Sequence, residues 1–215
     1  MVLMLEINAN FATFTQPRAR EYAASFPYPP PATVYGLLLS LVGECDRAVH
    51  QGVRLAIGMV SQPRSVMLTR SKKLEQEPRS TTVLRKVRRL KKTDLNHPSN
   101  SRPDFQEVLC GIDFVVGVDS QGDRNDLEAR IVNALRHPET VDRFGGLSLG
   151  ESRDLVNDIR ILEELPEAAR WLVVSRRGQT LPVWVNYRGA RGTRWACFEE
   201  GAFGDRAFCA IAPAD

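Results

Sequence analysis

Ten basic residues are concentrated in residues 70–92, where only two acidic residues, Glu75 and Glu77, accompany them. This basic segment carries a formal charge of +8, while the whole chain carries only +3, so the rest of the chain is net negative. Because Lys and Arg that neutralise phosphates supply most sequence-independent affinity for nucleic acids, the segment predicts a polynucleotide ligand. The candidate contacts are Arg70, Lys72, Lys73, Arg79, Arg85, Lys86, Arg88, Arg89, Lys91 and Lys92.

The basic segment also has a simpler interpretation, since runs of charge are usually solvated surface or disordered tails. Apolar and β-branched residues interrupt this run at a spacing that favours a hairpin or a short helix. These residues are Thr81, Thr82, Val83, Leu84, Val87 and Leu90. We therefore expect the segment to have a defined shape and to present its charges to a ligand.

Residues 144–152, the glycine loop, read Phe-Gly-Gly-Leu-Ser-Leu-Gly-Glu-Ser. Glycines let a backbone approach a phosphate or a ribose closely. The loop could simply be a tight connection between a helix and an edge strand, but three glycines and two serines in eight residues exceed what a turn needs. The candidate RNA contacts here are Gly145, Gly146, Ser148 and Gly150.

The sequence contains features of two classes of enzyme, an α/β-hydrolase and a metal-independent endoribonuclease. Residues 146–150 match the GxSxG elbow of α/β-hydrolases, but that triad needs a histidine after the serine, and all three histidines precede Ser148. RNA cleavage without metal needs a general base and an acid, for which His97, near Lys91 and Lys92, is the only plausible candidate. We expect no catalytic residue, metal or cofactor, and keep an endoribonuclease as the alternative.

The chain has 215 residues, of which 43% are hydrophobic, as in one large domain or one domain with a small appendage. No apolar run approaches the roughly 20 residues of a membrane span, and residues 1–8 lack the features of a signal peptide. The four cysteines are scattered without a CxxC pair, which predicts buried thiols in a reducing compartment. These features predict a cytoplasmic protein.

Hydrophobic patterns predict an α+β fold. Alternation predicts strands at residues 3–11, 53–60, 108–118 and 155–162, with residues 3, 5, 7, 9 and 11 on one apolar face. One helix is expected near residues 31–43, and a second follows the cap Asp126 and stops at His137 and Pro138. This β-α-β-β-α-β order is the ferredoxin-like arrangement of RNA-recognition domains.

The expected organisation is a ferredoxin-like domain at residues 1–165, with a basic insertion at residues 70–105. A C-terminal antiparallel β extension follows at residues 166–215, where strands 171–175 and 181–187 are expected to form a hairpin around residues 176–179. Further strands are expected at residues 194–198 and 207–212.

A proline-rich stretch, Phe-Pro-Tyr-Pro-Pro-Pro at residues 26–31, precedes the first helix. It could be a polyproline ligand for an SH3-type domain, but prolines also suit the first turn of a helix, and the apolar residues that follow favour the helix. Tyr28 and Tyr35 are candidates for stacking on a base, with packing against this helix as the alternative.

Residues 25–43 (Ser-Phe-Pro-Tyr-Pro-Pro-Pro-Ala-Thr-Val-Tyr-Gly-Leu-Leu-Leu-Ser-Leu-Val-Gly) and 143–152 (Arg-Phe-Gly-Gly-Leu-Ser-Leu-Gly-Glu-Ser) strongly resemble the CRISPR-associated RAMP family called Cas five, especially type I-B-like members. The resemblance covers the first 165 residues. It implies an RNA-recognition-like domain with a thumb between its second and third strands. It also implies a subunit that caps the 5′ handle of the guide RNA in Cascade, and that contacts the first backbone subunit and the large subunit that reads the PAM.

By this resemblance, residues 70–92 would be the thumb and residues 145–150 the RAMP glycine-rich loop. A type I-C branch of the family cleaves precursor guide RNA with a Tyr, Lys and His set, which cannot be placed here. The resemblance therefore implies a non-catalytic RNA-binding subunit that reaches target DNA only through the complex, in defence or in RNA-guided transposition. A general single-strand or ribosomal-type RNA binder would explain the charge but not the two motifs together.

Overall fold

The computed structural model describes residues 2–17, 22–60, 80–88, 101–185 and 192–214. Its helices are α1 (Pro31–Leu41) and α2 (Leu127–Arg136), with short 3-10 turns at Pro138–Thr140 and Asp205–Ala207. Its strands are β1 (Leu3–Ala12), β2 (Tyr22–Ala23), β3 (Arg54–Met59), β4 (Ser80–Arg88), β5 (Ser101–Asp119), β6 (Val156–Ile161), β7 (Arg170–Ser175), β8 (Gln179–Trp184), β9 (Arg194–Gly201) and β10 (Cys209–Ala210).

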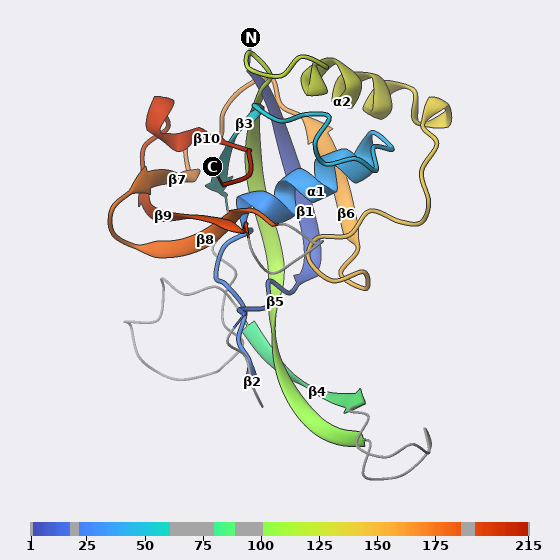
Figure 1. Cartoon of the computed structure of the whole chain (residues 1–215), viewed down its shortest axis with the longest axis vertical. Coiled ribbons are helices and arrows are strands. Elements are labelled where there is room, and N and C mark those ends of the chain that lie inside the picture. The colour runs from blue at the N-terminus through green and yellow to red at the C-terminus, as the bar shows by residue number, and fades with distance from the viewer. Residues whose placement is uncertain (1, 18–21, 61–79, 89–100, 186–191, 215) are drawn as a thin grey trace.

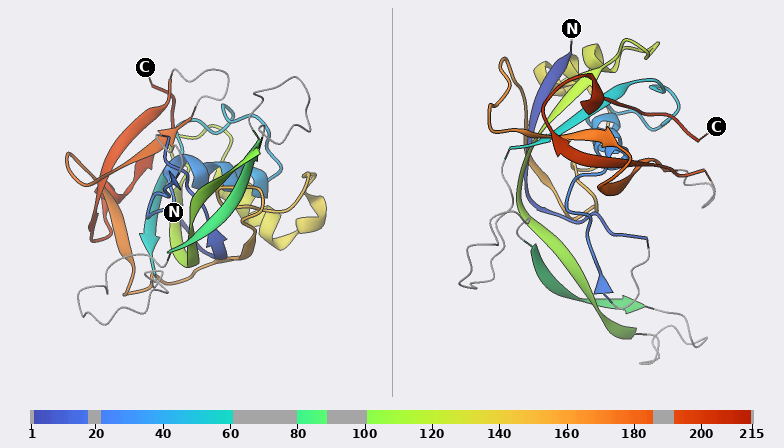
Figure 2. Two further views of the ribbon diagram at one scale, coloured as in Figure 1. Left: turned by 90° about the horizontal axis from the view of Figure 1, so that it is seen from below. Right: turned by 90° about the vertical axis from the view of Figure 1, so that its left-hand side faces the viewer.

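The strands form one curled sheet in the order β6-β1-β5-β3-β7-β9-β8, with β2 and β4 paired to β5 and β10 paired to β3. The pairings are antiparallel except for the short β2–β5 contact. Both helices lie on the same side of the central strands, and the C-terminal strands curl away from β3 at one flank (Figures 1 and 2). The chain is thus an α+β protein whose main core lies between the helices and the sheet.

Helix α1 begins where prolines predict it, because Pro31 occupies the first turn, where a backbone N–H has no helical partner anyway. Most of its residues are apolar because the curled sheet covers most of its surface, and one face lines an open groove. On one side it faces the central strands, and on another Tyr35 lies 6.1 Å from Trp184 of β8, centroid to centroid. The alternative of an SH3 ligand is wrong, since Pro29, Pro30 and Pro31 are buried.

Helix α2 follows the predicted pattern. The side chain of Asp126 accepts a hydrogen bond of 3.1 Å from the backbone N–H of Ala129, which satisfies one of the free amides of the first turn. Leu127, Ile131 and Ala134 form its buried stripe. The strands predicted at residues 53–60 and 155–162 are confirmed as β3 and β6.

Strand β1 buries Leu5, Ile7 and Ala9 completely, as the alternation predicts. The prediction is wrong for Phe11, whose side chain is 53% exposed. Phe11 pairs with Cys110, next to Gly111, which has a φ of +64°. A left-handed residue interrupts the regular pleat, so the alternation of buried and exposed faces does not continue through this point.

Strand β4 pairs with the first half of β5, from Ser80 opposite Leu109 to Arg88 opposite Ser101. These two segments, residues 80–88 and 101–109, form a two-stranded ribbon that projects from the rest of the molecule (Figures 1 and 2). We name this ribbon the arm. Of the hairpin or short helix expected in the basic segment, residues 80–88 form a strand, whose partner at residues 101–109 lies beyond that segment. Strand β5 starts earlier than the predicted residue 108 because the arm extends it.

The predicted hairpin between residues 171–175 and 181–187 is wrong. Strands β7 and β8 both pair with β9, which lies between them. The connection crosses β9 at Gly178, which has a φ of +98° and lies so close that a Cβ there would be 2.1 Å from the carbonyl oxygen of Phe198. Strand β9 is longer than expected, and β10 is shorter than the predicted strand 207–212.

The expectation of buried thiols holds for only part of the set. Cys209 is buried, and its burial raises the pKa of its thiol, whereas Cys45 is exposed and Cys110 and Cys197 are partly exposed. Cys45 lies in the irregular segment after α1, where no strand or helix covers it. Neither of the two described helices has the length and apolar character needed to span a membrane.

Candidate functional site

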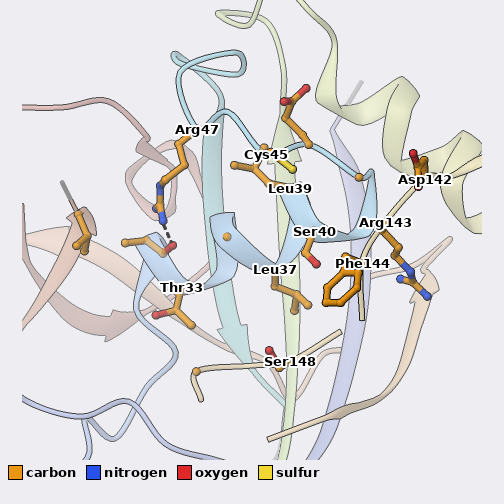
Figure 3. A pocket seen from close by; sticks show the side chains of 16 residues that line it. Thr33, Leu37, Leu39, Ser40, Cys45, Arg47, Asp142, Arg143, Phe144 and Ser148 are labelled. Carbon is orange, nitrogen blue, oxygen red and sulfur yellow. Dashed lines mark hydrogen bonds between the residues drawn. The ribbon is translucent and has the colours of Figure 1, made fainter. Parts of the chain in front are cut away.

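The glycine loop and helix α1 enclose a groove of about 740 Å³ (Figure 3). We name it the α1 groove. From the helix it is lined by Thr33, Leu37 and Ser40, and from the other side by Arg143, Phe144 and Ser148. Its volume falls within the range of about 300–1,000 Å³ that is typical of ligand pockets. Two segments about one hundred residues apart in the sequence therefore form one concave surface.

The loop is held at its C-terminal half and open at its N-terminal half. Leu149 is fully buried, its amide donates to the carbonyl of Asp154 at 2.8 Å, and Ser148 forms an isolated bridge with Leu155. Gly145 and Gly146 are exposed, and within the described part of the chain neither amide has a protein acceptor. These two N–H groups are accessible to an anionic or polar ligand.

The three glycines of the loop do different work. Gly150 has a φ of +102°, and a Cβ there would lie 2.3 Å from the carbonyl oxygen of Thr13, so the fold itself requires glycine. Among the described residues, a Cβ on Gly145, which has a φ of +81°, would meet nothing within 4 Å, and a Cβ on Gly146 would meet only the side chain of Leu155, at 3.3 Å. A substitution at Gly146 can therefore test whether a ligand approaches the loop backbone, because it should not distort the loop conformation.

A buried side chain fixes the loop to the base of the arm. Gln106 of β5 is fully buried; its amide nitrogen donates to Glu151 at 2.5 Å, and its oxygen accepts from Arg153 at 2.5 Å. Arg153 also pairs with Glu151 at 3.2 Å. Gln106 is out of water, and both ends of its side-chain amide are satisfied by the partly exposed Glu151 and Arg153, so these contacts tie the glycine loop to β5 at the base of the arm.

The basic candidates divide between described and undescribed residues. Arg85, Lys86 and Arg88 lie on β4 in the arm. The others lie outside the described residues, as does His97; they are Arg70, Lys72, Lys73, Arg79, Arg89, Lys91 and Lys92. Three of the ten predicted basic contacts therefore lie on the arm.

The two candidate tyrosines have different surroundings. Tyr35 is fully buried and its hydroxyl donates to the carbonyl of Arg47 at 2.7 Å, so packing is correct for this residue and base stacking is wrong. Tyr28 is half-buried and donates to Glu200 at 2.8 Å. Burial and this hydrogen bond raise the pKa of Tyr28 to about 12, so it stays a neutral donor. Stacking by Tyr28 remains a prediction.

The histidines in the described residues have structural surroundings. His50 is fully buried, with Nδ1 2.6 Å from a carboxylate oxygen of Asp123 and Nε2 2.8 Å from a guanidinium nitrogen of Arg130. Since arginine can only donate, Nε2 accepts and Nδ1 donates to Asp123. His137 lies at the end of α2 with 59% of its side chain exposed. Within the described ranges, no group of three or more His, Cys, Asp or Glu side chains gathers to hold a metal ion.

Phe144 is a site residue that sequence reasoning passed over. Its exposed area is 105% of the reference value, yet its side chain lines the α1 groove, as Figure 3 shows. Its position beside two glycines could have indicated an exposed ring, because a small loop has no core in which to bury an aromatic side chain.

No protein-family profile matches the chain. The chain is 40% identical to the CRISPR-associated protein Cas5 of Myxococcus xanthus (strain DK1622), over 90% of this chain and 87% of that protein. Its fold is similar to that of a chain in a CRISPR RNA-guided surveillance complex, with a TM-score of 0.56 and 13% identity over 100% of this chain and 92% of the other. It is also similar to a crystal structure of a Cas protein, with a TM-score of 0.50 and 16% identity over 94% of both chains.

Proposed function

Because the chain belongs to the Cas5 family of CRISPR-associated proteins, we propose that it is a non-catalytic subunit of a type I Cascade effector that caps the 5′ handle of the guide RNA. One observation carries the proposal: the two segments that resemble the family form the two walls of a single groove, and Gln106 links that groove to the arm. In this proposal a single RNA strand contacts both the groove and the arm.

Each part of this surface has a distinct task in the proposal. Cationic side chains of the basic segment hold the phosphates of the handle, because Lys and Arg there release the condensed counterions of the RNA. The exposed amides of Gly145 and Gly146, with the hydroxyl of Ser148, approach a phosphate or a ribose. The ring of Tyr28, whose hydroxyl donates to Glu200, stacks on a base.

We assign residues 1–165 to a ferredoxin-like domain of the RNA-recognition type. The chain order β1, α1, β3, β5, α2, β6 supports this, with the arm inserted between β3 and β5 as the thumb. Residues 166–215 then form a β extension that continues the same sheet beyond β3. Such a division leaves the RNA-binding parts in the first domain.

The proposed partners follow from the proposed place in the complex. The subunit would join the first backbone subunit to the large subunit that reads the PAM, and would reach target DNA only through that assembly. The similarity to a chain of an RNA-guided surveillance complex supports an assembled state. As a subunit of such a complex, the protein is proposed to act in the cytoplasm.

Replacing Gly146 with valine is expected to weaken binding of handle RNA about tenfold or more, with little change in melting temperature. A branched side chain would cover the open amides of the loop, while the one close neighbour of its Cβ among the described residues is the exposed and adjustable side chain of Leu155. Binding is measured with a labelled handle RNA, and stability by thermal unfolding.

The matched control is Gly204→Val in the C-terminal extension, where a Cβ has open space around it and the φ of 169° is extended. It should bind RNA as the unaltered protein does. Gly150→Val should instead destabilise the fold, since a left-handed backbone alone costs about 1–2 kcal/mol for a residue with a side chain. Normal RNA binding by folded Gly146→Val would show that the RNA does not approach the backbone at Gly146.

Incubation of the protein with precursor guide RNA is expected to leave the RNA intact, with or without magnesium. Metal-free cleavage needs a base and an acid on both sides of the scissile phosphate. The two histidines of the described residues are a buried structural residue and an exposed helix end. Denaturing gels over a range of protein concentrations provide the measurement. Repeat-specific cleavage that disappears in His97→Ala would assign the protein to the processing branch instead.

A further inference from the structure

The ring of Phe144 is the least covered large apolar side chain among the described residues, at 105% of its reference exposure. Gly145 and Gly146 follow it and put no side chain beside it, and the groove opens next to it (Figure 3). Exposed apolar rings in a concave site are typical of surfaces that receive a ligand. The ring has two free faces, and stacking on a flat partner would cover one of them.

The charges around the α1 groove favour an uncharged occupant. Its lining includes two arginines, Arg47 and Arg143, and two acids, Glu44 and Asp142. Arg47 is directed inward, where its guanidinium lies over the rings of Tyr35 and Trp184, and Glu44 is paired with Arg130 at 2.9 Å. The exposed charges that remain, Arg143 and Asp142, cancel each other. The charged side chains of the groove would therefore add little net attraction for a phosphate, unlike those of the basic segment, and a phosphate there would depend on the loop amides and hydroxyls alone.

Hydroxyl groups supply the polar contacts of the groove. Thr33 and Ser40 on α1 and Ser148 on the glycine loop line it together with the apolar Leu37 and Leu39. Hydroxyls both donate and accept, so they can pair with the edge of a heterocycle that presents both kinds of group. An apolar floor, convergent hydroxyls and a free aromatic face are the features of a site for a flat heterocycle.

We propose that the α1 groove holds one unpaired nucleobase of the guide RNA, stacked on Phe144, while the phosphates are held by the basic segment. The inference rests on the proposed function and assigns separate binding roles to the α1 groove and to the basic segment. Phe144 contributes stacking without charge, and the arm contributes charge without reading a base. One nucleotide of the handle is thereby turned out of the strand and fixed in the groove.

The test uses the full-length protein and a set of synthetic handle RNAs, each with 2-aminopurine at a single position. Stacking on an aromatic ring quenches this fluorophore, so one position should lose fluorescence on binding. Phe144→Ala and Phe144→Leu should abolish that quenching and weaken binding about 5- to 150-fold, while Phe144→Tyr should keep both. The slope of affinity against salt should be unchanged in all three variants, because no phosphate contact is lost.

The possible results are separable. If the unaltered protein does not bind handle RNA, the proposed function fails. If it binds but no position is quenched, or if Phe144→Leu keeps full affinity, the inference alone is overturned. It is also overturned if Phe144→Ala keeps its RNA affinity but no longer assembles with the backbone subunit, which would make Phe144 a protein contact. Because Phe144 is fully exposed, thermal unfolding of the variants should match the unaltered protein.

Discussion

Replacement of His50 with alanine is expected to lower the free energy of unfolding by about 2–4 kcal/mol, the largest loss of stability for any side chain in the described polar network. The imidazole is fully buried and joins Asp123 to Arg130. Its removal leaves the fully buried carboxylate of Asp123 without this donor and opens a cavity beneath the segment that follows α1. Urea denaturation measures the change.

The effect is expected to be large because this network joins three segments at the end of the sheet opposite the arm: the loop after β5, helix α2 and the segment after α1. Asp123 also accepts from the amide of Leu127, at the start of α2, and Arg130 donates to Glu44 and to the carbonyl of Val42. One histidine thus connects the end of α1 to the start of α2. A buried polar network costs most when a single member is missing, because its partners cannot regain water.

The matched control is His137→Ala, whose side chain is 59% exposed, and which should change stability by no more than about 0.5 kcal/mol. RNA binding by folded His50→Ala should be near normal, because the described network meets the α1 groove at Glu44 and the variant keeps the ion pair between Glu44 and Arg130. A change below about 1 kcal/mol for His50→Ala would show that water replaces the imidazole at little cost.

Neutralising Arg85, Lys86, Arg88 and Arg89 together is expected to cause the largest loss of RNA affinity. Each phosphate contact on single-stranded RNA contributes about 0.7 to the slope of log affinity against log salt, so loss of all four would reduce the slope by about 2.8. The weakening should be strongest at low salt, where counterion release contributes most. Titrations of handle RNA at several salt concentrations give the slope directly.

A control with the same change in net charge separates contact from general attraction. Arg124, Arg136, Arg176 and Arg177 are exposed and lie outside the groove and the arm. Their joint neutralisation should lower affinity slightly through the long-range field and leave the slope nearly unchanged. An unchanged slope in the arm variant would mean that the basic segment is solvated surface, as runs of charge often are.

The sequence by itself predicted the local elements, because each depends on neighbours along the chain. The proline-rich stretch and the apolar run after it predicted α1. Asp126 as a cap predicted the start of α2, and the hydrophobic pattern predicted β3 and β6. The concentration of charge in residues 70–92 likewise needed no structure. Propensity, capping and periodicity act within a few residues and can therefore be recognised in a single chain.

Tertiary structure decided the features that depend on distant residues. Strand β9 enters between β7 and β8, because the short connection passes over it at Gly178, and no local pattern records that crossing. Gly146 and Gly150 look alike in sequence, but the carbonyl of Thr13 lies against only the second. The exposure of Phe144 depends on which segments pack beside it. Burial and strand pairing depend on contacts between segments far apart in the chain, so only the tertiary structure determines them.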